Sequence, residues 1–118
     1  MHTVIETRAF QRQAAGAGMT EAEIAALVTY LASNPTAGDE MAGTGGCRKV
    51  RVAGRGKGKS GGYRTITFYT GPDIPLFLLA VFSKGDRSNL SKAEQNSLGE
   101  LTKTILAQYR GSVVKVRA

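Results

Sequence analysis

The segment that most restricts the fold is residues 76–82, Leu-Phe-Leu-Leu-Ala-Val-Phe, which is apolar at every position. A strand with one face in water would alternate apolar and polar residues, so this segment predicts an interior strand covered on both faces. It is far too short to cross a bilayer, and we expect no membrane association. The rest of the chain must therefore supply elements that cover this strand.

Helix signals precede this strand twice. Residues 7–17 are expected to form a helix around Phe10 and Ala14, and Thr20 with Glu23 forms a capping box that opens a second helix. The second helix is expected to end at Asn34-Pro35. Its inner face is predicted from apolar residues at helical spacing: Ile24, Leu27, Val28 and Leu31.

A third helix is predicted after the strand, from a second capping box at Ser91 and Glu94, with a buried stripe of Leu98, Leu101 and Ile105. Further strands are predicted at 3–5, 47–52 and 63–69, with a loop over 36–46. The residues after Gly111 alternate, and predict either a short strand or a free end.

The predicted order, β-α-α-β-β-β-α, indicates an α+β fold in one domain spanning residues 1–118. We expect a small, twisted, mostly antiparallel sheet with helices on one face. Few apolar residues remain to cover the other face, so that face is expected to be partly open. Lys49, Arg51 and the glycine-rich segment between the strands would border it.

All of the net charge of +7 lies in residues 41–72, a window without acidic residues. Outside the window, nine basic and nine acidic residues cancel. The window holds Arg48, Lys49, Arg51, Arg55, Lys57, Lys59 and Arg64. Such a local cationic surface on a neutral chain indicates a polyphosphate partner, above all nucleic acid. The alternative is a solvated basic loop, which the flanking strands and the glycine spacing make less favourable.

Several classes of site are excluded by composition. With a single cysteine, Cys47, the chain has no internal disulfide framework, and we expect Cys47 to be a small core residue. A single histidine, His2, leaves no His/Cys zinc cluster and no Ser-His-Asp arrangement. We therefore expect no metal and no cofactor. The first residues lack the pattern of a signal peptide, so a soluble, cytoplasmic protein is expected.

Two nucleotide-binding patterns occur in the basic segment without the context they need. Residues 56–61 have the glycine spacing of a dinucleotide fingerprint, and residues 58–60 resemble the end of a P-loop. Both motifs require a helix to follow, so that its N-terminus meets the phosphates. A strand is predicted there instead, so neither pattern indicates a nucleotide site.

Residues 43–52, Gly-Thr-Gly-Gly-Cys-Arg-Lys-Val-Arg-Val, are followed at residues 58–64 by Gly-Lys-Ser-Gly-Gly-Tyr-Arg. Together they closely resemble the HigB-type branch of the RelE/ParE toxin superfamily. The resemblance extends to Gly-Met-Thr-Glu-Ala-Glu-Ile at 18–24 and Leu-Leu-Ala-Val-Phe-Ser-Lys at 78–84. It covers nearly the whole chain and implies a RelE-like fold.

The resemblance also implies a function. Such proteins are toxins of type II toxin–antitoxin systems that enter the ribosomal A site and cut the exposed mRNA. A cognate antitoxin silences them, and the pair generally represses its own operon. We therefore expect the ribosome, mRNA and a helix-turn-helix antitoxin as partners, with operator DNA bound only through the antitoxin.

This chain departs from the family pattern at two places. Its basic segment reads Gly-Arg-Gly-Lys-Gly-Lys-Ser-Gly-Gly, two residues longer than usual, so either Arg55 or Lys57 could take the family's arginine position. Phe82 stands where the family commonly has a tyrosine, which weakens any mechanism that needs a phenol there.

Cleavage of RNA by its own 2′-hydroxyl needs a base, an acid and positive charge for the transition state. Arg64 is the predicted transition-state clamp, because arginine keeps its charge. Lys84 is the candidate acid or base, since crowded cations lower the pKa of a lysine. Lys59 and Arg51 are expected to hold the scissile region. The residues expected to grip rRNA or mRNA phosphates are Lys49, Arg55 and Lys57.

Two aromatic residues of the predicted strands, Tyr63 and Tyr69, could stack on a base, but packing in the sheet is favoured. Two other function classes stay open: a toxin of the same fold that poisons another target such as DNA gyrase, and a non-enzymatic nucleic-acid-binding module. The basic segment favours the RNA interpretations over a gyrase poison, which needs no acid-free phosphate cradle.

Overall fold

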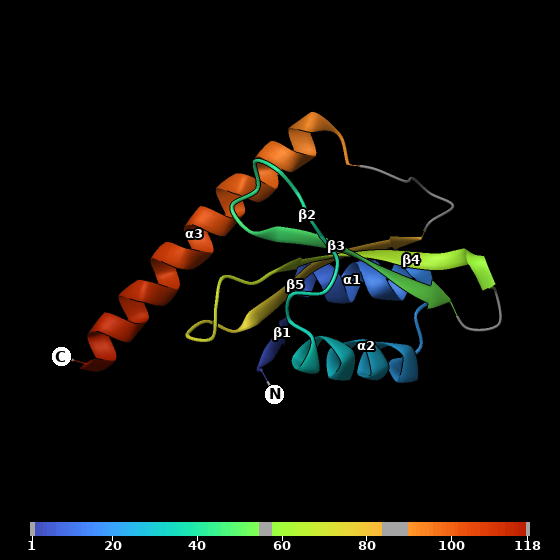
Figure 1. Cartoon of the computed structure of the whole chain (residues 1–118), viewed down its shortest axis with the longest axis horizontal. Coiled ribbons are helices and arrows are strands. Elements are labelled where there is room, and N and C mark those ends of the chain that lie inside the picture. The colour runs from blue at the N-terminus through green and yellow to red at the C-terminus, as the bar shows by residue number, and fades with distance from the viewer. Residues whose placement is uncertain (1, 55–57, 84–89, 118) are drawn as a thin grey trace.

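A five-stranded sheet forms the centre of the computed structural model, which describes residues 2–54, 58–83 and 90–117 (Figure 1). The side chains at 54, 58–61 and 110–117 are outside this description. The elements are β1 (Val4–Glu6), α1 (Arg8–Ala17), α2 (Glu21–Ser33), β2 (Asp39–Glu40), β3 (Cys47–Gly54), β4 (Gly58–Phe68), β5 (Leu76–Ser83) and α3 (Lys92–Arg117). None of the helices, over the residues described, has the length and apolar character needed to cross a membrane.

The strands follow the order β1-β5-β4-β3-β2. β1 runs parallel to β5, and the other three pairs are antiparallel, as expected for a mostly antiparallel α+β sheet. One strand was not predicted: β2, two residues long, lies in the segment expected to be a loop. It pairs with Arg48 and Lys49 of β3.

β5 is the interior strand that its composition predicted, with β1 on one side and β4 on the other. Leu76, Leu78 and Val81 belong to one buried cluster, whereas Leu79 and Phe82 belong to a second cluster. The register shifts between Ile66 and Thr67 of β4, so residues 79 and 80 of β5 do not follow simple alternation. The strand is therefore buried on both faces.

The first cluster packs between the sheet and the two N-terminal helices, which lie on one side of it (Figure 1). Phe10 and Ala14 of α1 and Leu27 and Leu31 of α2 are buried in it, as the helical spacing predicts. The predicted cap of α2 is also present: Glu23 N–H donates to Thr20 Oγ1 at 3.1 Å, and Thr20 N–H donates to Glu23 Oε1 at 2.9 Å.

The expectation that all helices share one face is wrong, because α3 lies on the other side of the sheet (Figure 1). Leu98 and Ile105 of α3 pack against the second cluster. Thr102 Oγ1 donates a hydrogen bond of 2.8 Å to Thr44 O. This hydrogen bond sets which side of α3 faces the rest of the protein. Leu101, predicted to be buried, is therefore 43 % exposed, whereas Thr102 is fully buried.

The capping box before α3 is confirmed, with Glu94 N–H donating to Ser91 Oγ and Ser91 N–H to Glu94 Oε1. The prediction for the residues after Gly111 is wrong, because α3 continues to Arg117. Helix propagation adds one hydrogen bond for each residue fixed, whereas a strand needs a neighbouring edge to pair with. The alternating valines therefore extend the helix.

The β3–β4 hairpin is longer than predicted and takes up most of the glycine-rich segment. β3 reaches Gly54 and β4 begins at Gly58, and these two residues are partners in the ladder. The close approach depends on Gly62, because a Cβ atom there would overlap the carbonyl oxygen of Val52. In the sequence, the glycines of this segment suggested a flexible loop. In the structure, they allow β3 and β4 to approach closely.

Cys47 is fully buried, as expected for a small core residue. Burial raises the pKa of its thiol to about 11, although a hydrogen bond with Thr44 partly opposes this effect. The unfolded thiol loses its proton first as pH rises above about 9, so the free energy of unfolding should fall between about pH 9 and 11, by at most about 1.4 kcal/mol per pH step of one. Urea unfolding at about pH 8 and about pH 10.5 checks this, because the Cys47→Ala variant should lose less stability over the same interval.

Candidate nucleic-acid-binding face

Three cations of the basic window share the sheet face opposite α1 and α2. Lys49 and Arg51 are two positions apart on β3, and side chains with that spacing point to the same face. Val50, between them, belongs to the cluster under α1 and α2, so Lys49 and Arg51 point away from those helices. Arg64 of β4 is the ladder partner of Arg51 and shares its face.

We call Lys49, Arg51 and Arg64 the cationic face. Arg51 is exposed and Arg64 is half-buried, and neither makes an ion pair with another described residue. Like charges directly opposite each other on antiparallel strands destabilise a sheet. An anion bound between the two guanidinium groups would relieve that repulsion, and arginine pairs well with phosphate oxygens.

A shallow cavity of about 290 Å³ is lined by all three cations. Gly38 and Asp39 form another side of it, where Asp39 is the ladder partner of Lys49, and Tyr30 of α2 and Val50 of β3 also line it. Lys49 thus has a carboxylate beside it, whereas Arg51 and Arg64 lie further along the hairpin. The strongest site for an anion is therefore at the two arginines.

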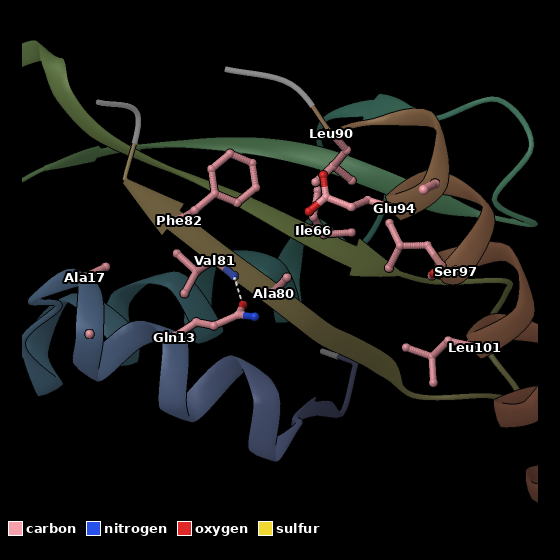
Figure 2. Close-up of a pocket in the computed structure, with 13 residues that line it drawn as sticks. Gln13, Ala17, Ile66, Ala80, Val81, Phe82, Leu90, Glu94, Ser97 and Leu101 are labelled. Atoms are coloured by element: carbon pink, nitrogen blue, oxygen red, sulfur yellow. Dashed lines mark hydrogen bonds between the residues drawn. The ribbon is translucent and has the colours of Figure 1, made fainter. Parts of the chain in front are cut away.

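A larger, mostly apolar cleft of about 570 Å³ lies at the end of β5, between α1 and α3 (Figure 2). Phe82 lines it and is the ladder partner of Arg64 on β5. Ile66 lies beneath it, and Leu90 and Leu98 approach from the α3 side. The cleft is therefore linked to the cationic face through Phe82, the neighbour of Arg64 in the ladder.

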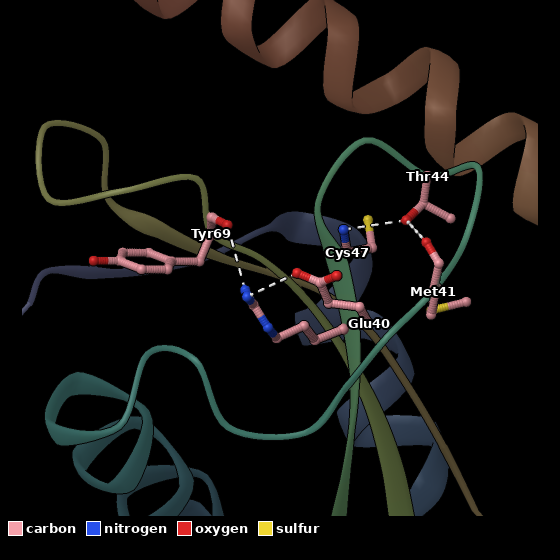
Figure 3. Close-up of polar contacts among 6 residues, drawn as sticks. Glu40, Met41, Thr44, Cys47 and Tyr69 are labelled. Carbon is pink, nitrogen blue, oxygen red and sulfur yellow. Dashed lines mark hydrogen bonds and ion pairs between the residues drawn. The ribbon is translucent and has the colours of Figure 1, made fainter.

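Arg48, in the same basic window, has a structural role, because it contacts Glu40 and Tyr69, both of which Figure 3 labels. Its Nη2 contacts Glu40 Oε1 at 3.1 Å, and its Nη1 donates to Tyr69 O at 3.5 Å. Thr44 orders the nearby loop, because its Oγ1 donates to Met41 O at 2.6 Å and accepts from Cys47 N–H at 3.1 Å. These contacts join β2, β3 and the end of β4, and leave Arg48 outside the cationic face.

The predicted site residues divide into those that the structure places and those that it does not. Lys49, Arg51 and Arg64 are brought together. Lys59 belongs to β4, but its side chain is outside the description. Three further residues lie outside the described part of the chain: Arg55, Lys57 and Lys84.

Both candidate stacking tyrosines pack in the structure, as favoured. Tyr63 is buried under α2, and burial together with nearby Glu23 raises the pKa of its phenol. Tyr69 is half-buried, and its ring meets His2 edge to face at a centroid distance of 5.3 Å. The histidine therefore lies at the β1 end of the sheet, and it packs against an aromatic ring.

Sequence reasoning missed Tyr30 and Asp39 as neighbours of the cationic face. Tyr30 is off the apolar stripe of α2 and half exposed, so helical spacing gives it no role. Asp39 lies in a segment read as loop, and only its pairing with Lys49 brings it to the face. An exposed aromatic residue on an otherwise small-residue helix surface is the one local signal that could have indicated Tyr30.

Residues 2–117 match the family model described as the RelE toxin of the RelE / RelB toxin-antitoxin system. The match includes every strand and helix of the structure, the hairpin that carries the cationic face among them.

Proposed function

Because this chain belongs to the RelE toxin family and is the toxin of a toxin–antitoxin pair, we propose that it is a ribosome-dependent mRNA endonuclease of the HigB-type branch. The branch assignment rests on the Gly-Lys-Ser-Gly-Gly-Tyr-Arg sequence, which opens β4 and ends at Arg64. We expect the protein to act in the cytoplasm and to inhibit translation. Its antitoxin is expected to be a helix-turn-helix protein that alone carries the pair to operator DNA.

The observation that supports RNA cleavage best is the direct pairing of Arg51 with Arg64 on a face without α1 or α2. Two arginines directly opposite each other on antiparallel strands repel, and an anion between them would offset that repulsion. In a phosphoryl-transfer transition state, charge increases on the non-bridging oxygens, and fixed guanidinium groups stabilise it. The pair therefore suits a scissile phosphate.

The proposed reaction uses the RNA's own 2′-hydroxyl. Its oxygen, deprotonated by a base, attacks the adjacent phosphorus, and the bond from phosphorus to the 5′-oxygen of the next nucleotide breaks. The products are a 2′,3′-cyclic phosphate and a 5′-hydroxyl that has taken a proton from an acid. No redox partner or metal is required to balance this step.

We assign the clamp on the phosphate to Arg64, with Arg51 and Lys59 holding the scissile nucleotides. Lys84, which follows β5 in the sequence, is the proposed acid or base. We assign binding of the surrounding rRNA and mRNA phosphates to Lys49, Arg55 and Lys57. Histidine takes no part in this scheme, because His2 packs against Tyr69.

A site with few proton-transfer groups depends on positioning. Holding the 2′-hydroxyl in line with the leaving oxygen can supply a large part of the rate enhancement, and the ribosome holds mRNA in a fixed path. The proposed function thus explains how a cationic sheet face could cut RNA efficiently only in that setting.

Primer extension on a translated message tests this function. We expect purified protein to cut inside the reading frame of ribosome-bound mRNA at least about 100-fold faster than it cuts the same RNA free in solution. The new ends should be a 2′,3′-cyclic phosphate and a 5′-hydroxyl. Equal rates on bound and free RNA would show that the ribosome is not needed, and intact mRNA alongside arrested replication would favour a gyrase poison.

A further inference from the structure

Tyr30 of α2 is an exposed aromatic side chain beside the cationic face. Three large apolar side chains are exposed in the described part of the chain, and Tyr30, half exposed, is the aromatic one among them; the others are Ile5 and Leu101. Single exposed apolar residues are common on protein surfaces and need no explanation by themselves. Tyr30 differs from the other two in its surroundings, because it lines the same cavity as the three residues of the cationic face.

This cavity reaches from the cationic face around the edge of β3 to α2. α2 packs on the opposite side of the sheet, yet Tyr30 lines the cavity together with Arg51 and Arg64. The passage exists because β2 is only two residues long, whereas β3 continues past it to Gly54. Over the residues described, no strand lies beside Arg51 on this edge of the sheet.

Tyr30 also lies where this cavity meets a second one. A mostly apolar groove of about 580 Å³ runs between α2 and β3, and Tyr30, Val50 and Arg51 line both spaces. Ala22 and Ala26 keep the groove shallow on the side of α2. The ring of Tyr30 therefore has open space beside it, and the side chain of Arg51 lies at the same boundary.

Cations and an aromatic ring around one cavity fit single-stranded RNA. Its phosphates pair with guanidinium groups, and its unpaired bases stack on aromatic side chains. Base and phosphate belong to the same nucleotide, so a phosphate at Arg51 and Arg64 leaves an adjoining base within reach of a ring that lines the same cavity. The bases of a duplex stay stacked inside it and cannot reach such a ring.

We infer that Tyr30 is a base-stacking residue, which holds the base of a nucleotide next to the scissile phosphate while Arg51 and Arg64 hold the phosphate. This inference rests on the proposed function and adds a contact from α2 to the one made by the sheet. The two tyrosines of β4 and its end are not placed for this role, because Tyr63 is buried and the ring of Tyr69 packs against His2.

Affinity for two short oligonucleotides at low salt tests this contact. The first is a 2′-O-methyl RNA of about six nucleotides, which lacks the attacking hydroxyl, and the second has the same backbone without bases. We expect Tyr30→Ala to weaken binding of the first by about 10-fold or more and to leave binding of the second unchanged. Tyr30→Phe should bind both as the parent does, because stacking needs the ring and not the hydroxyl. Equal losses for the two oligonucleotides, or a parent protein that binds neither, would overturn the inference.

The fold should not depend on the ring of Tyr30. The side chain lies off the apolar stripe of α2 and is half exposed. The main-chain oxygen of Tyr30 accepts hydrogen bonds of 2.9 Å from both the N–H and the Nδ2 of Asn34, and these bonds do not involve the side chain of residue 30. The melting temperature of Tyr30→Ala should therefore stay close to that of the parent, so that weaker binding reports the lost contact.

A fluorescent variant reports stacking directly. The chain contains no tryptophan, so Tyr30→Trp introduces a single indole that can itself stack on a base. We expect the oligonucleotide with bases to quench its emission by at least about twofold, and the backbone without bases to leave it unchanged. The matched control is Thr29→Trp, at a neighbouring exposed position that lines neither cavity, and its emission should respond to neither oligonucleotide.

Equal quenching of both variants would overturn the inference, and so would quenching of Tyr30→Trp by an oligoglutamate peptide as strong as that by RNA, which would favour an acidic protein segment. Neither titration involves ribosomes or cleavage. Stacking at residue 30 without ribosome-dependent cleavage would therefore contradict the proposed function alone. Ribosome-dependent cleavage by a protein in which Tyr30→Ala binds both oligonucleotides as the parent does would contradict the stacking contact alone.

Discussion

Arg64→Ala should slow mRNA cleavage on the ribosome by about 100- to 1,000-fold, which is the usual effect of removing one positioned charge from a transition state. Arg64 is half-buried at the surface of the sheet, opposite Arg51 and Phe82, so its loss should leave the fold intact. Removing one of two opposed arginines should even raise the melting temperature slightly. Single-turnover cleavage and a thermal melt of the same preparation measure both effects.

Two matched variants test whether slower cleavage comes from losing the guanidinium group at this position or from losing any positive charge in the basic window. Arg64→Lys keeps the charge but loses the planar fork, so it should retain part of the activity. Arg48→Ala removes a cation of the same window that is bound to Glu40, away from the cationic face, so its cleavage rate should stay close to that of the parent. If Arg64→Ala cleaved within about tenfold of the parent, Arg64 would not be the clamp.

Gly38→Ala should give the largest loss of stability among the single glycine substitutions, about 2–4 kcal/mol. Gly38 has a φ of +92°, in the left-handed region that favours glycine. A Cβ atom there would also overlap Lys49 O and lie 2.9 Å from Val50 Cγ2. Both costs fall on the junction of β2 with β3, which supports Lys49, and urea unfolding measures their sum.

Two other glycines serve as controls for the two costs. Gly43 has a φ of +77°, but nothing lies within 4 Å of the place that a Cβ atom would take, so Gly43→Ala should cost only about 1 kcal/mol from backbone strain. Gly16 lies in α1 with open space around it, so Gly16→Ala should stabilise the protein by about 0.5–1 kcal/mol. If Gly38→Ala cost no more than Gly43→Ala, the neighbouring backbone would have moved to make room.

Local signals in the sequence predicted the elements well. The capping boxes at Thr20 and Ser91 and the apolar stripe of α2 depend on residues three or four positions apart, and all are present. The interior position of β5 also followed from its own composition. Alternation on β3 likewise placed Lys49 and Arg51 on a face away from α1 and α2, as expected.

Features that depend on contacts between distant parts of the chain could not be predicted from local sequence signals. The side of the sheet taken by α3 depends on its contact with the loop before β3, where a Cβ atom at Gly99 would lie 2.9 Å from Gly43 O. The pairing of Arg51 with Arg64 depends on the register of the hairpin, and the register shift between Val52 and Gly54 lies in a segment read as loop. Helical periodicity gives no information on the side of the sheet that α3 takes or on the register of the hairpin. For this reason Leu101 was expected to be buried, and Tyr30 was not predicted to lie near the cationic face.

The parallel pairing of β1 with β5 delays assembly of the molecule during its own synthesis. Thr7, next to β1, donates to the carbonyl of Leu78, 71 residues further along the chain. Until β5 has been made, the β3–β4 hairpin has only the two-residue strand β2 beside it and lacks its partner on the β4 side, and a hairpin with so little support is only marginally stable in water. Contacts between such distant residues also slow folding. The arginine pair is therefore held firmly only after translation has passed the interior strand, so a partly made chain presents no finished cationic surface to the ribosome that is making it.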